Sequence, residues 1–406
     1  MGGCLVLSAA PRRHIALLGD GNSVHVQRWA HEMAVRGWRL SLITARPAEA
    51  GALPAGVAQH VLPPVRRSAD WLWRTGAARR AVAALRPDLL HAHYVTSYGY
   101  LGARAARASG LPLMLTAWGS DLLLTPRRHP LIARLTAWTL AQARLLTGDS
   151  ADLLQAARRL CPRVRTELVH WGVERARFAP APWAAKPGFE AVSLRSWAPN
   201  YAIGTILDAL AQVRRQQPGA VLHLLGGGPQ EAALRVQAAR LGLDESALRW
   251  HGRQDDAGMA AVLARCKLAI TVPHSDATSV SLLESMACGL AVIASDLPAN
   301  RHWLAAPPGA SASASATSAT NGNALVPAGD ANALAAAWRA LMQNEARAAA
   351  AGQANARRIA LEGDRRLQMD RVDALYRALL GDETRPGAGG SHAAKPLAGA
   401  PTRNMP

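Results

Sequence analysis

The stretch from Pro273 to Asp296 reads PHSDATSVSLLESMACGLAVIASD and decides the fold class of this chain. The apolar run 268–272 before it predicts a strand, the polar segment predicts a loop, and Gly289 ends a helix before a second strand at 291–294. This is one β–α–β unit whose polar loop lies at the carboxyl end of a strand, where open α/β sheets bind their ligands. The free N–H groups at the start of the helix favour an anion such as a phosphate.

Two acids of this segment are candidates for ligand contacts. Asp276 and Glu284 are eight residues apart, which is about two turns of a helix. We therefore expect both carboxylates to face one ligand from the same side. The alternative for the isolated segment is a helix N-cap at Ser275 or Asp276 and a solvated Glu284.

The segment resembles the acid-x7-acid signature of the retaining glycosyltransferases of family 4, which have the two-domain GT-B fold. The resemblance implies that Asp276 approaches the donor sugar and that Glu284 binds the ribose hydroxyls of the nucleotide. Asp stands here where Glu is more usual, and Thr278, Ser279 and Ser281 replace a Gly-Phe-Gly run. Because the shorter acid ends about one methylene further from the sugar, the identity of the donor stays open.

Polar residues also follow three predicted strands in the first half of the chain. The strand 14–18 leads into GDGNS at 19–23, the strand 88–93 into the residues 94–98, and the strand 113–116 into AWGSD at 117–121. Since the carboxyl ends of parallel strands share one edge of a sheet, we expect these loops to build one site. The strings GDGNSVHVQRW, HAHYVTSYG and WGSD resemble a branch of the same family that serves bacterial surface polysaccharide assembly.

That resemblance implies roles for residues of the first half. Gly21, Ser23 and His25 are expected near the donor diphosphate and sugar, as are Trp118 and Gly119. A histidine is common in the family where this chain has Trp118. We expect His93 and Asp121 to take over its role beside the reacting sugar. For the GxG pair at 19–21 a plain tight turn is the alternative, and for His91 and His93 it is a strand end with satisfied hydrogen bonds.

The segment 180–187 carries prolines at 180, 182 and 187 and predicts a linker between two α/β domains. After it, a strand at 191–194 ends at Arg195, whose guanidinium we expect to reach a bound diphosphate. The family usually adds a Lys about five residues later, where this chain has Asn200 or Tyr201. A surface arginine without a ligand is the alternative. The remaining predicted donor-binding residues are Gly227, Gly228, Thr278, Ser279, Val280 and Ser281.

The predicted fold is α/β of the GT-B class: two Rossmann-like, doubly wound domains face a central cleft, and a C-terminal helix crosses back to the first domain. The expected parts are an N-terminal extension at 1–12, an acceptor-side domain at 13–180 with the helix at about 364–380, and a nucleotide-sugar domain at 188–360. A low-complexity run at 307–323 and a tail at 384–406 are expected to be disordered.

Charge and composition limit the classes of partner that can be expected. Residues 1–180 hold 24 Lys and Arg against 10 Asp and Glu, while the remainder holds 22 against 18. The basic half favours contact with anionic lipids or with the diphosphate of a lipid-linked acceptor, although Arg-rich compositional drift is the alternative. Nucleic acid is not expected, because no helix-turn-helix signature, aromatic-basic ladder or zinc ligand set accompanies the charge. No apolar run approaches the roughly 20 residues of a membrane span. We therefore expect a cytoplasmic protein, peripheral at the inner membrane face.

The resemblance covers about residues 13–380 and implies transfer of a sugar from a nucleotide-diphosphate sugar to an acceptor hydroxyl, on a saccharide or a lipid-linked molecule, with retention of the anomeric configuration. We expect no cofactor and no metal, because no DxD-type pair stands in a suitable loop and the pair Asp255 and Asp256 is expected at the surface. Trp118, the shorter acid and the missing Lys favour an alternative. This is a catalytically degenerate GT-B protein that serves as a binding or scaffold subunit of a polysaccharide assembly complex.

Overall fold

The computed structural model describes residues 13–67, 70–305 and 321–381. The predicted N-terminal extension, most of the predicted low-complexity run and the predicted tail lie outside these residues. Asn323, the last residue of that predicted run, is buried, and its Oδ1 accepts a hydrogen bond from the Val292 N–H at 2.9 Å. The predicted end of the run is therefore wrong, because the chain has rejoined the second sheet by this residue.

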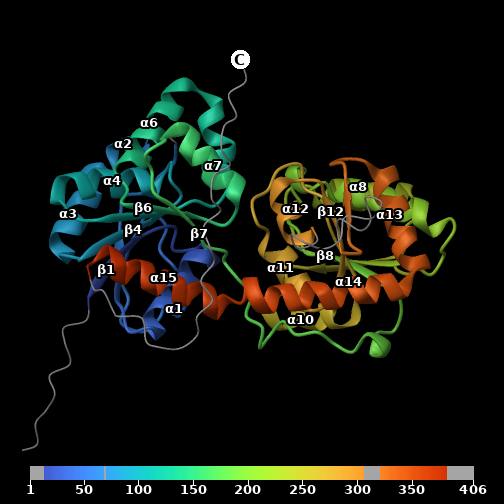
Figure 1. Cartoon of the computed structure of the whole chain (residues 1–406). Coiled ribbons are helices and arrows are strands. Elements are labelled where there is room, and N and C mark those ends of the chain that lie inside the picture. The colour runs from blue at the N-terminus through green and yellow to red at the C-terminus, as the bar shows by residue number, and fades with distance from the viewer. Residues whose placement is uncertain (1–12, 68–69, 306–320, 382–406) are drawn as a thin grey trace, which may run out of the picture.

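The described residues form two parallel sheets that are covered by helices on both faces (Figure 1). The first sheet has the strand order β3-β2-β1-β4-β5-β6-β7 and the second β10-β9-β8-β11-β12-β13. Each order runs outward in both directions from a switch point, between β1 and β4 or between β8 and β11. The GT-B class predicted from the sequence is confirmed, and each sheet lies within one predicted domain.

The strands and helices of the first half are β1 (His14–Leu18), α1 (Val24–Val35), β2 (Arg39–Thr44), β3 (Ala58–Val61), α2 (Asp70–Trp73), α3 (Thr75–Leu85), β4 (Leu89–His93), α4 (Tyr98–Ser109), β5 (Leu113–Thr116), α5 (Ser120–Leu123), α6 (Pro130–Ala141), β6 (Leu145–Gly148), α7 (Ala151–Leu160) and β7 (Thr166–Leu168). Those of the second half are β8 (Glu190–Ser193), α8 (Ile203–Arg214), β9 (Val221–Leu225), α9 (Glu231–Arg240), β10 (Leu248–Gly252), α10 (Asp256–Arg265), β11 (Leu268–Thr271), α11 (Val280–Ala287), β12 (Ala291–Ser295), α12 (Pro298–Leu304), β13 (Ala324–Val326), α13 (Ala331–Gln343), α14 (Glu345–Arg358) and α15 (Arg365–Leu379).

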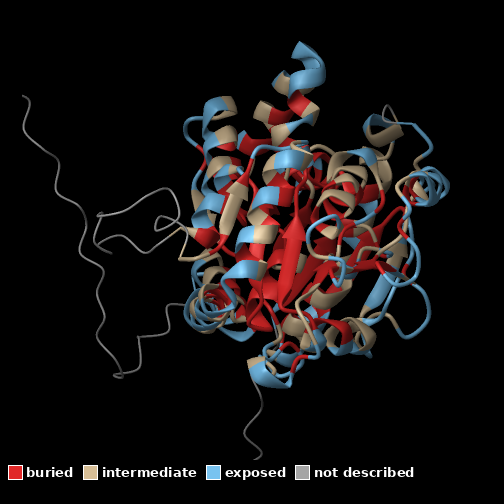
Figure 2. Cartoon of the chain, turned by 90° about the vertical axis from the view of Figure 1, so that its right-hand side faces the viewer, coloured by how far each residue is buried: buried red, intermediate tan, exposed pale blue. Residues whose placement is uncertain are grey.

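The central strands are apolar runs with no alternation, as expected for strands that are covered on both faces. Every residue of β1, β4 and β12 is buried. Figure 2 shows the buried strands at the centre, and the helices around them turn their exposed faces outward. The first sheet packs one face against the helices α3, α4 and α7 and the other against α1 and α15.

The last helix returns to the first domain, as predicted. The chain crosses where Val173 pairs with Asp364 in an isolated bridge, and α15 then lies beside α1 (Figure 1). The Tyr376 hydroxyl accepts from Trp29 Nε1 at 2.9 Å and lies 2.6 Å from His91 Nδ1, inside the core of the first domain. The second domain is thus held to the first by two chain crossings rather than one, which fixes the loops that face each other between them.

Candidate functional site

A cavity of about 430 Å³ lies where the carboxyl ends of the two sheets meet. The second domain contributes the loops after β8 and β11, and the first domain contributes the loops after β4, β5 and β6 together with the first turn of α1. The two sides touch directly: Thr278 Oγ1 donates to the Asp149 carbonyl at 2.5 Å. A Cβ on Gly119 would lie 3.4 Å from the Ala277 Cβ. The cavity is therefore shared by both domains and lined by loops of both.

Arg195 forms the charged centre of the second domain's side. Its guanidinium donates to the Ser279 hydroxyl, to the Ser281 hydroxyl at 3.0 Å and to Asp276 Oδ2 at 2.6 Å. The Tyr201 ring lies under it, 4.4 Å from Cζ to the ring centre. Arg195 is 9% exposed, so its charge acts in a partly desolvated place where electrostatic contacts are strong.

The loop 273–281 is held from both ends. Asn200 clamps its start, since its Nδ2 donates to the Ser275 carbonyl at 2.8 Å and its Oδ1 accepts from the Ser275 N–H at 3.2 Å. Ser279 caps α11, and its hydroxyl accepts from the Leu282 N–H at 3.3 Å. The N-terminus of α11 therefore points at the cavity beside Arg195, which is the arrangement expected of an anion site.

Only one of the two acids of the acid-x7-acid pattern lines the cavity. Asp276 lines the cavity, whereas Glu284 is 4% exposed and is absent from the cavity wall. Asp276 belongs to the loop before α11 and Glu284 to the helix itself, so the cavity gives no support to the expectation that both carboxylates face one ligand from the same side. Glu284 lies instead in the electrostatic range of Arg28 and Arg365, and burial raises its pKa to about 7.

The first domain's side is aromatic. Trp118 stacks on His25, with ring centres 4.4 Å apart and planes at 22°. Trp118 Nε1 donates to His93 Nδ1 at 3.2 Å, and Tyr94 completes this side of the wall. Burial lowers the pKa of His25 to about 4, so the ring is neutral at neutral pH. The first domain thus offers aromatic ring surfaces to the cavity, and no Lys or Arg is among its lining residues.

His93 and Asp121 do not reach the cavity wall. His93 is fully buried behind Trp118, and burial lowers its pKa to about 3. Asp121 accepts the backbone N–H groups of Val95, Trp118 and Gly119 at 2.9 to 3.1 Å, so its carboxylate shapes the loop after β5. Their predicted role beside the reacting sugar gains no support from this geometry.

Of the predicted glycines, Gly119 lines the cavity, whereas Gly21, Gly227 and Gly228 do not. Gly21 donates its N–H to the Arg46 carbonyl at 2.9 Å, and a Cβ there would lie 2.4 Å from the Ala48 N. The Gly21 N–H is thus engaged by a neighbouring loop, and the residue is small because two loops pass close together there. A Cβ on Gly228 would lie 2.5 Å from the Trp197 carbonyl oxygen, whereas one on Gly227 would meet only the Arg253 side chain, at 3.4 Å. Ser23 is the N-cap residue of α1, and its side chain makes no capping hydrogen bond.

Sequence reasoning missed Asp149. It follows β6, is 8% exposed and lines the cavity from the first domain. Burial and the nearby Asp276 raise its pKa well above the usual range of an aspartate. The sequence does carry a signal for Asp149, because LLTGDS at 145–150 is an apolar strand followed by polar residues. The same pattern marks the three strands of the first half whose loops are predicted to build the site.

The acids expected as a surface run connect the two domains. Asp255 caps α10 and accepts from the Gly258 N–H at 2.8 Å. Asp256 accepts from Arg28 of α1 at 2.7 Å on both oxygens and from Arg177 at 2.6 Å. Asp255 is exposed, as expected, whereas the Asp256 side chain is only 25% exposed, because the fold brings α1 against the start of α10.

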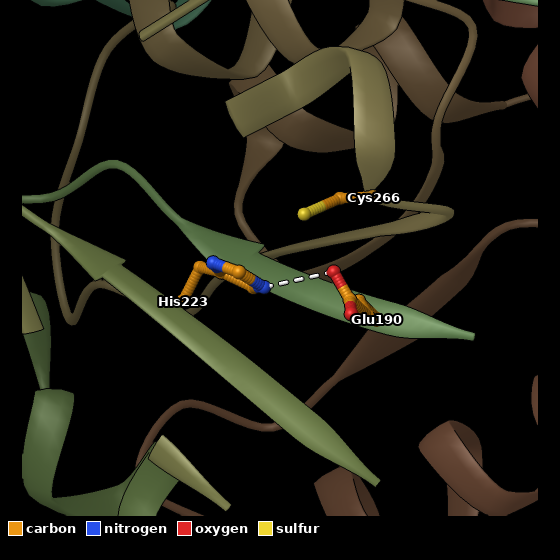
Figure 3. Close-up of side chains that lie close together, drawn as sticks. All are labelled: Glu190, His223 and Cys266. Carbon is orange, nitrogen blue, oxygen red and sulfur yellow. Dashed lines mark hydrogen bonds and ion pairs between the residues drawn. The ribbon is translucent and has the colours of Figure 1, made fainter. Parts of the chain in front are cut away.

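A second cluster of possible ligands lies toward the opposite end of the second sheet (Figure 3). Among the described residues, Glu190, His223 and Cys266 place their ligand atoms within 4.8 Å of one another. Glu190 already accepts from Arg265 at 2.8 and 3.1 Å and lies 3.0 Å from His223 Nε2. Burial raises the pKa of the Cys266 thiol. The group is thus a neutralised network that joins β8 to β9.

Family models match both halves of the chain. Residues 14–150 match a model described as glycosyl transferase 4-like, and residues 191–344 match one described as glycosyl transferases group 1. The chain belongs to the family-4 glycosyltransferases.

Curated relatives in this family are mycobacterial. Phosphatidyl-myo-inositol mannosyltransferase of Mycolicibacterium smegmatis is 27% identical over 275 residues, which is 64% of this chain and 63% of that protein. The Mycobacterium tuberculosis protein is 37% identical over 108 residues. That match spans only about a quarter of either protein, 26% of this chain and 27% of the relative.

Solved structures share the fold. Sucrose-phosphate synthase from Thermosynechococcus elongatus superposes with a TM-score of 0.76 at 18% identity and covers 92% of this chain and 100% of its own. HepE from Anabaena, solved with UDP-glucose, has a TM-score of 0.72 at 16% identity and covers 90% of this chain and 99% of its own. Identities this low establish the two-domain architecture and nothing finer.

Proposed function

We propose that this protein transfers a sugar from a nucleotide-diphosphate sugar to an acceptor hydroxyl, with retention of the anomeric configuration, in the biosynthesis of a glycolipid or cell-surface polysaccharide. One observation carries the proposal: Arg195 and the N-terminus of α11 converge on a cavity that both domains line. The HepE structure holds UDP-glucose, and the mycobacterial relatives act on phosphatidyl-myo-inositol. Both support a nucleotide sugar and a lipid or saccharide acceptor here.

The second domain's side supplies stabilisation of the departing diphosphate. As the glycosidic bond breaks, negative charge grows on the phosphate oxygens, and a fixed guanidinium together with helix N–H groups meets that charge without reorganising. In this structure Arg195 already points at the Ser279 and Ser281 hydroxyls, so the place is built before any ligand arrives. We assign the stabilisation of positive charge on the sugar to Asp276, which lines the same cavity and whose Oδ2 lies 2.6 Å from Arg195.

The first domain's side covers the sugar and excludes water. Trp118 and His25 present stacked rings to the cavity, and Thr278 ties the loop after β11 to Asp149. Enclosure of this kind protects an oxocarbenium-like sugar from hydrolysis. We propose that no metal takes part, since Asp255 and Asp256 are engaged by a helix N-terminus and by two arginines.

We further propose that the first domain rests on an anionic membrane surface. At α2, Trp73 is 77% exposed and Leu72 is 45% exposed, next to the exposed Arg66 and Arg67. An aromatic ring beside cations suits the headgroup layer. In the described part of the chain no helix is long and apolar enough to cross a bilayer. Co-sedimentation with phosphatidylglycerol vesicles that Trp73→Ala weakens, and none with phosphatidylcholine vesicles, is the expected result.

The function is tested by adding labelled nucleotide sugars and lipid extracts to the purified protein. Transfer by the protein alone, with an anomeric configuration in the product equal to that of the donor by NMR, supports the proposal. If the protein binds a nucleotide sugar but neither transfers nor hydrolyses it with any combination of donor and acceptor, the result would instead favour the scaffold alternative. An inverted product would exclude the retaining mechanism.

A further inference from the structure

Asp149 has no part in the scheme above, yet it is a cavity-lining carboxyl that the fold holds firmly. Its backbone carbonyl accepts from His170 Nδ1 at 2.9 Å and from Thr278 Oγ1 at 2.5 Å, so contacts from both domains fix it. The residue is 8% exposed, and in the described part of the chain no donor reaches its buried Oδ1. A buried carboxyl oxygen without a donor makes the ionised form of the carboxyl costly and favours the protonated form.

Burial and the charges around Asp149 oppose its ionised form and outweigh the backbone N–H groups of Thr278 and of Asp149 itself, which favour it. Asp276 faces it from the loop after β11, and the cation that compensates Asp276, Arg195, bonds to that acid. His170, packed against it from the segment after β7, is neutral because burial lowers its pKa to about 4. Asp152 in the first turn of α7 adds a further negative charge.

A bound diphosphate sharpens this imbalance. The cavity would then hold two carboxylates and a dianionic group around a single arginine at its wall. Several acidic groups in a poorly solvated site cannot all stay ionised, and protonation of one carboxyl lowers the repulsion at the least cost in free energy. A carboxylic acid kept neutral by its surroundings donates a hydrogen bond, which an anion accepts and a carboxylate cannot supply.

We propose that Asp149 binds the nucleotide-diphosphate sugar as a neutral carboxylic acid and donates a hydrogen bond to an oxygen of that ligand. The proton comes from solvent, so binding takes up a proton when the pH lies above the level at which free Asp149 ionises. This rests on the proposed function, since it needs a diphosphate in the cavity. It adds to that function a recognition residue from the domain opposite Arg195.

Proton uptake is measured directly by isothermal titration calorimetry in buffers of different ionisation enthalpy. The probes are UDP-glucose and GDP-mannose at pH 8, because neither carries a phosphate that titrates near that pH. The wild type is expected to take up as much as one proton per bound ligand, with affinity falling up to about tenfold per pH unit above the ionisation of Asp149. Asp149→Asn should bind with no uptake from this site and a flat pH dependence, while Asp149→Ala binds about tenfold more weakly, again with no uptake.

Asp152→Asn is the matched control, because it removes the same charge close by but outside the cavity wall, and it should take up protons as the wild type does. Wild-type binding with neither proton uptake nor a fall in affinity at any pH of a series that extends above pH 8, or equal uptake in Asp149→Asn, overturns the role of Asp149 and leaves sugar transfer standing. If neither probe nor free UDP or GDP binds the wild type, the proposed function fails together with this inference. Should the Asn variant not fold, the wild-type uptake and the Ala variant still decide.

Discussion

The two sides of the cavity differ in what they offer a ligand. The second domain's side is polar and charged, with Arg195 between Asp276 and the hydroxyls of Ser279 and Ser281. The first domain's side is built from Trp118, His25 and Tyr94, and its one acid is buried. Under the proposed function, the second domain stabilises the charge that develops on the diphosphate, and the first domain covers the sugar. Substitutions on either side test that division, and their expected effects differ in kind as well as size.

The largest effect is expected at Arg195. Arg195→Ala removes the cation to which we assign the diphosphate and leaves Asp276 without its partner, so kcat/KM should fall by about 10³-fold, or about 4 kcal/mol. Arg195→Lys keeps the charge but loses the planar fork and should recover part of the rate. Steady-state kinetics measure both, with the exposed Arg235→Ala of α9 as control. An Arg195→Ala rate within tenfold of the wild type would refute the assignment.

Glu284, behind the charged side, should govern how stability depends on pH. Its folded-state pKa of about 7 lies above the ordinary value of 4.5, so its contribution is fully present below pH 4.5 and is lost as the pH rises through 7. The loss amounts to at most about 3 kcal/mol. Glu284→Gln stays neutral throughout, so the fall in denaturant midpoint between pH 5 and pH 8 should shrink.

The matched control for Glu284 is Glu345→Gln. The Lys267 amine holds the pKa of Glu345 below its usual value, so this substitution should shift the midpoint equally at both pH values. Equal falls between pH 5 and pH 8 in the wild type and in Glu284→Gln would contradict the electrostatic environment described for Glu284.

On the aromatic side the expected loss is one of packing. Trp118→Ala removes the ring between His25 and His93 and should destabilise the protein by about 2 kcal/mol, less than a fully buried tryptophan would. Trp118→Phe keeps a stacked ring and loses only the bond to His93 Nδ1, which is worth about 1 kcal/mol. Thermal unfolding of the two variants gives the comparison, and an Ala variant as stable as the Phe variant would mean that the stack carries no energy.

The fold and the charged side were accessible from sequence because both follow from local patterns. Apolar runs without alternation gave the parallel strands, and each polar segment after a strand marked the edge that carries the site. Arg195, Asp276 and the hydroxyl run at 278–281 lie where this rule puts them. The rule was applied to β1, β4 and β5 but not to β6, and so it passed over Asp149.

What the sequence could not supply depends on contacts between distant segments. The spacing of Asp276 and Glu284 fits two helical turns, but the N-cap at Ser279 starts the helix after Asp276 and separates the two acids. The pair 255–256 looks like a solvated surface run, yet α1 brings Arg28 to Asp256 from 228 positions away in the chain. Patterns of period two or 3.6 carry no information on such pairings.

The smallest effect is expected at the ion pair between Arg28 of the first domain and Asp256 of the second. The Arg28 and Asp256 side chains are 21% and 25% exposed, so water and salt screen their ion pair. A double-mutant cycle with Arg28→Ala and Asp256→Asn should give a coupling energy below about 1 kcal/mol that falls further in high salt. Asp256→Asn alone should cost more than Arg28→Ala, because Asp256 also accepts from Arg177. A coupling above about 2 kcal/mol, unchanged by salt, would place this pair among the contacts that hold the cleft closed. Enclosure would then depend on charge at the rim rather than on the aromatic side.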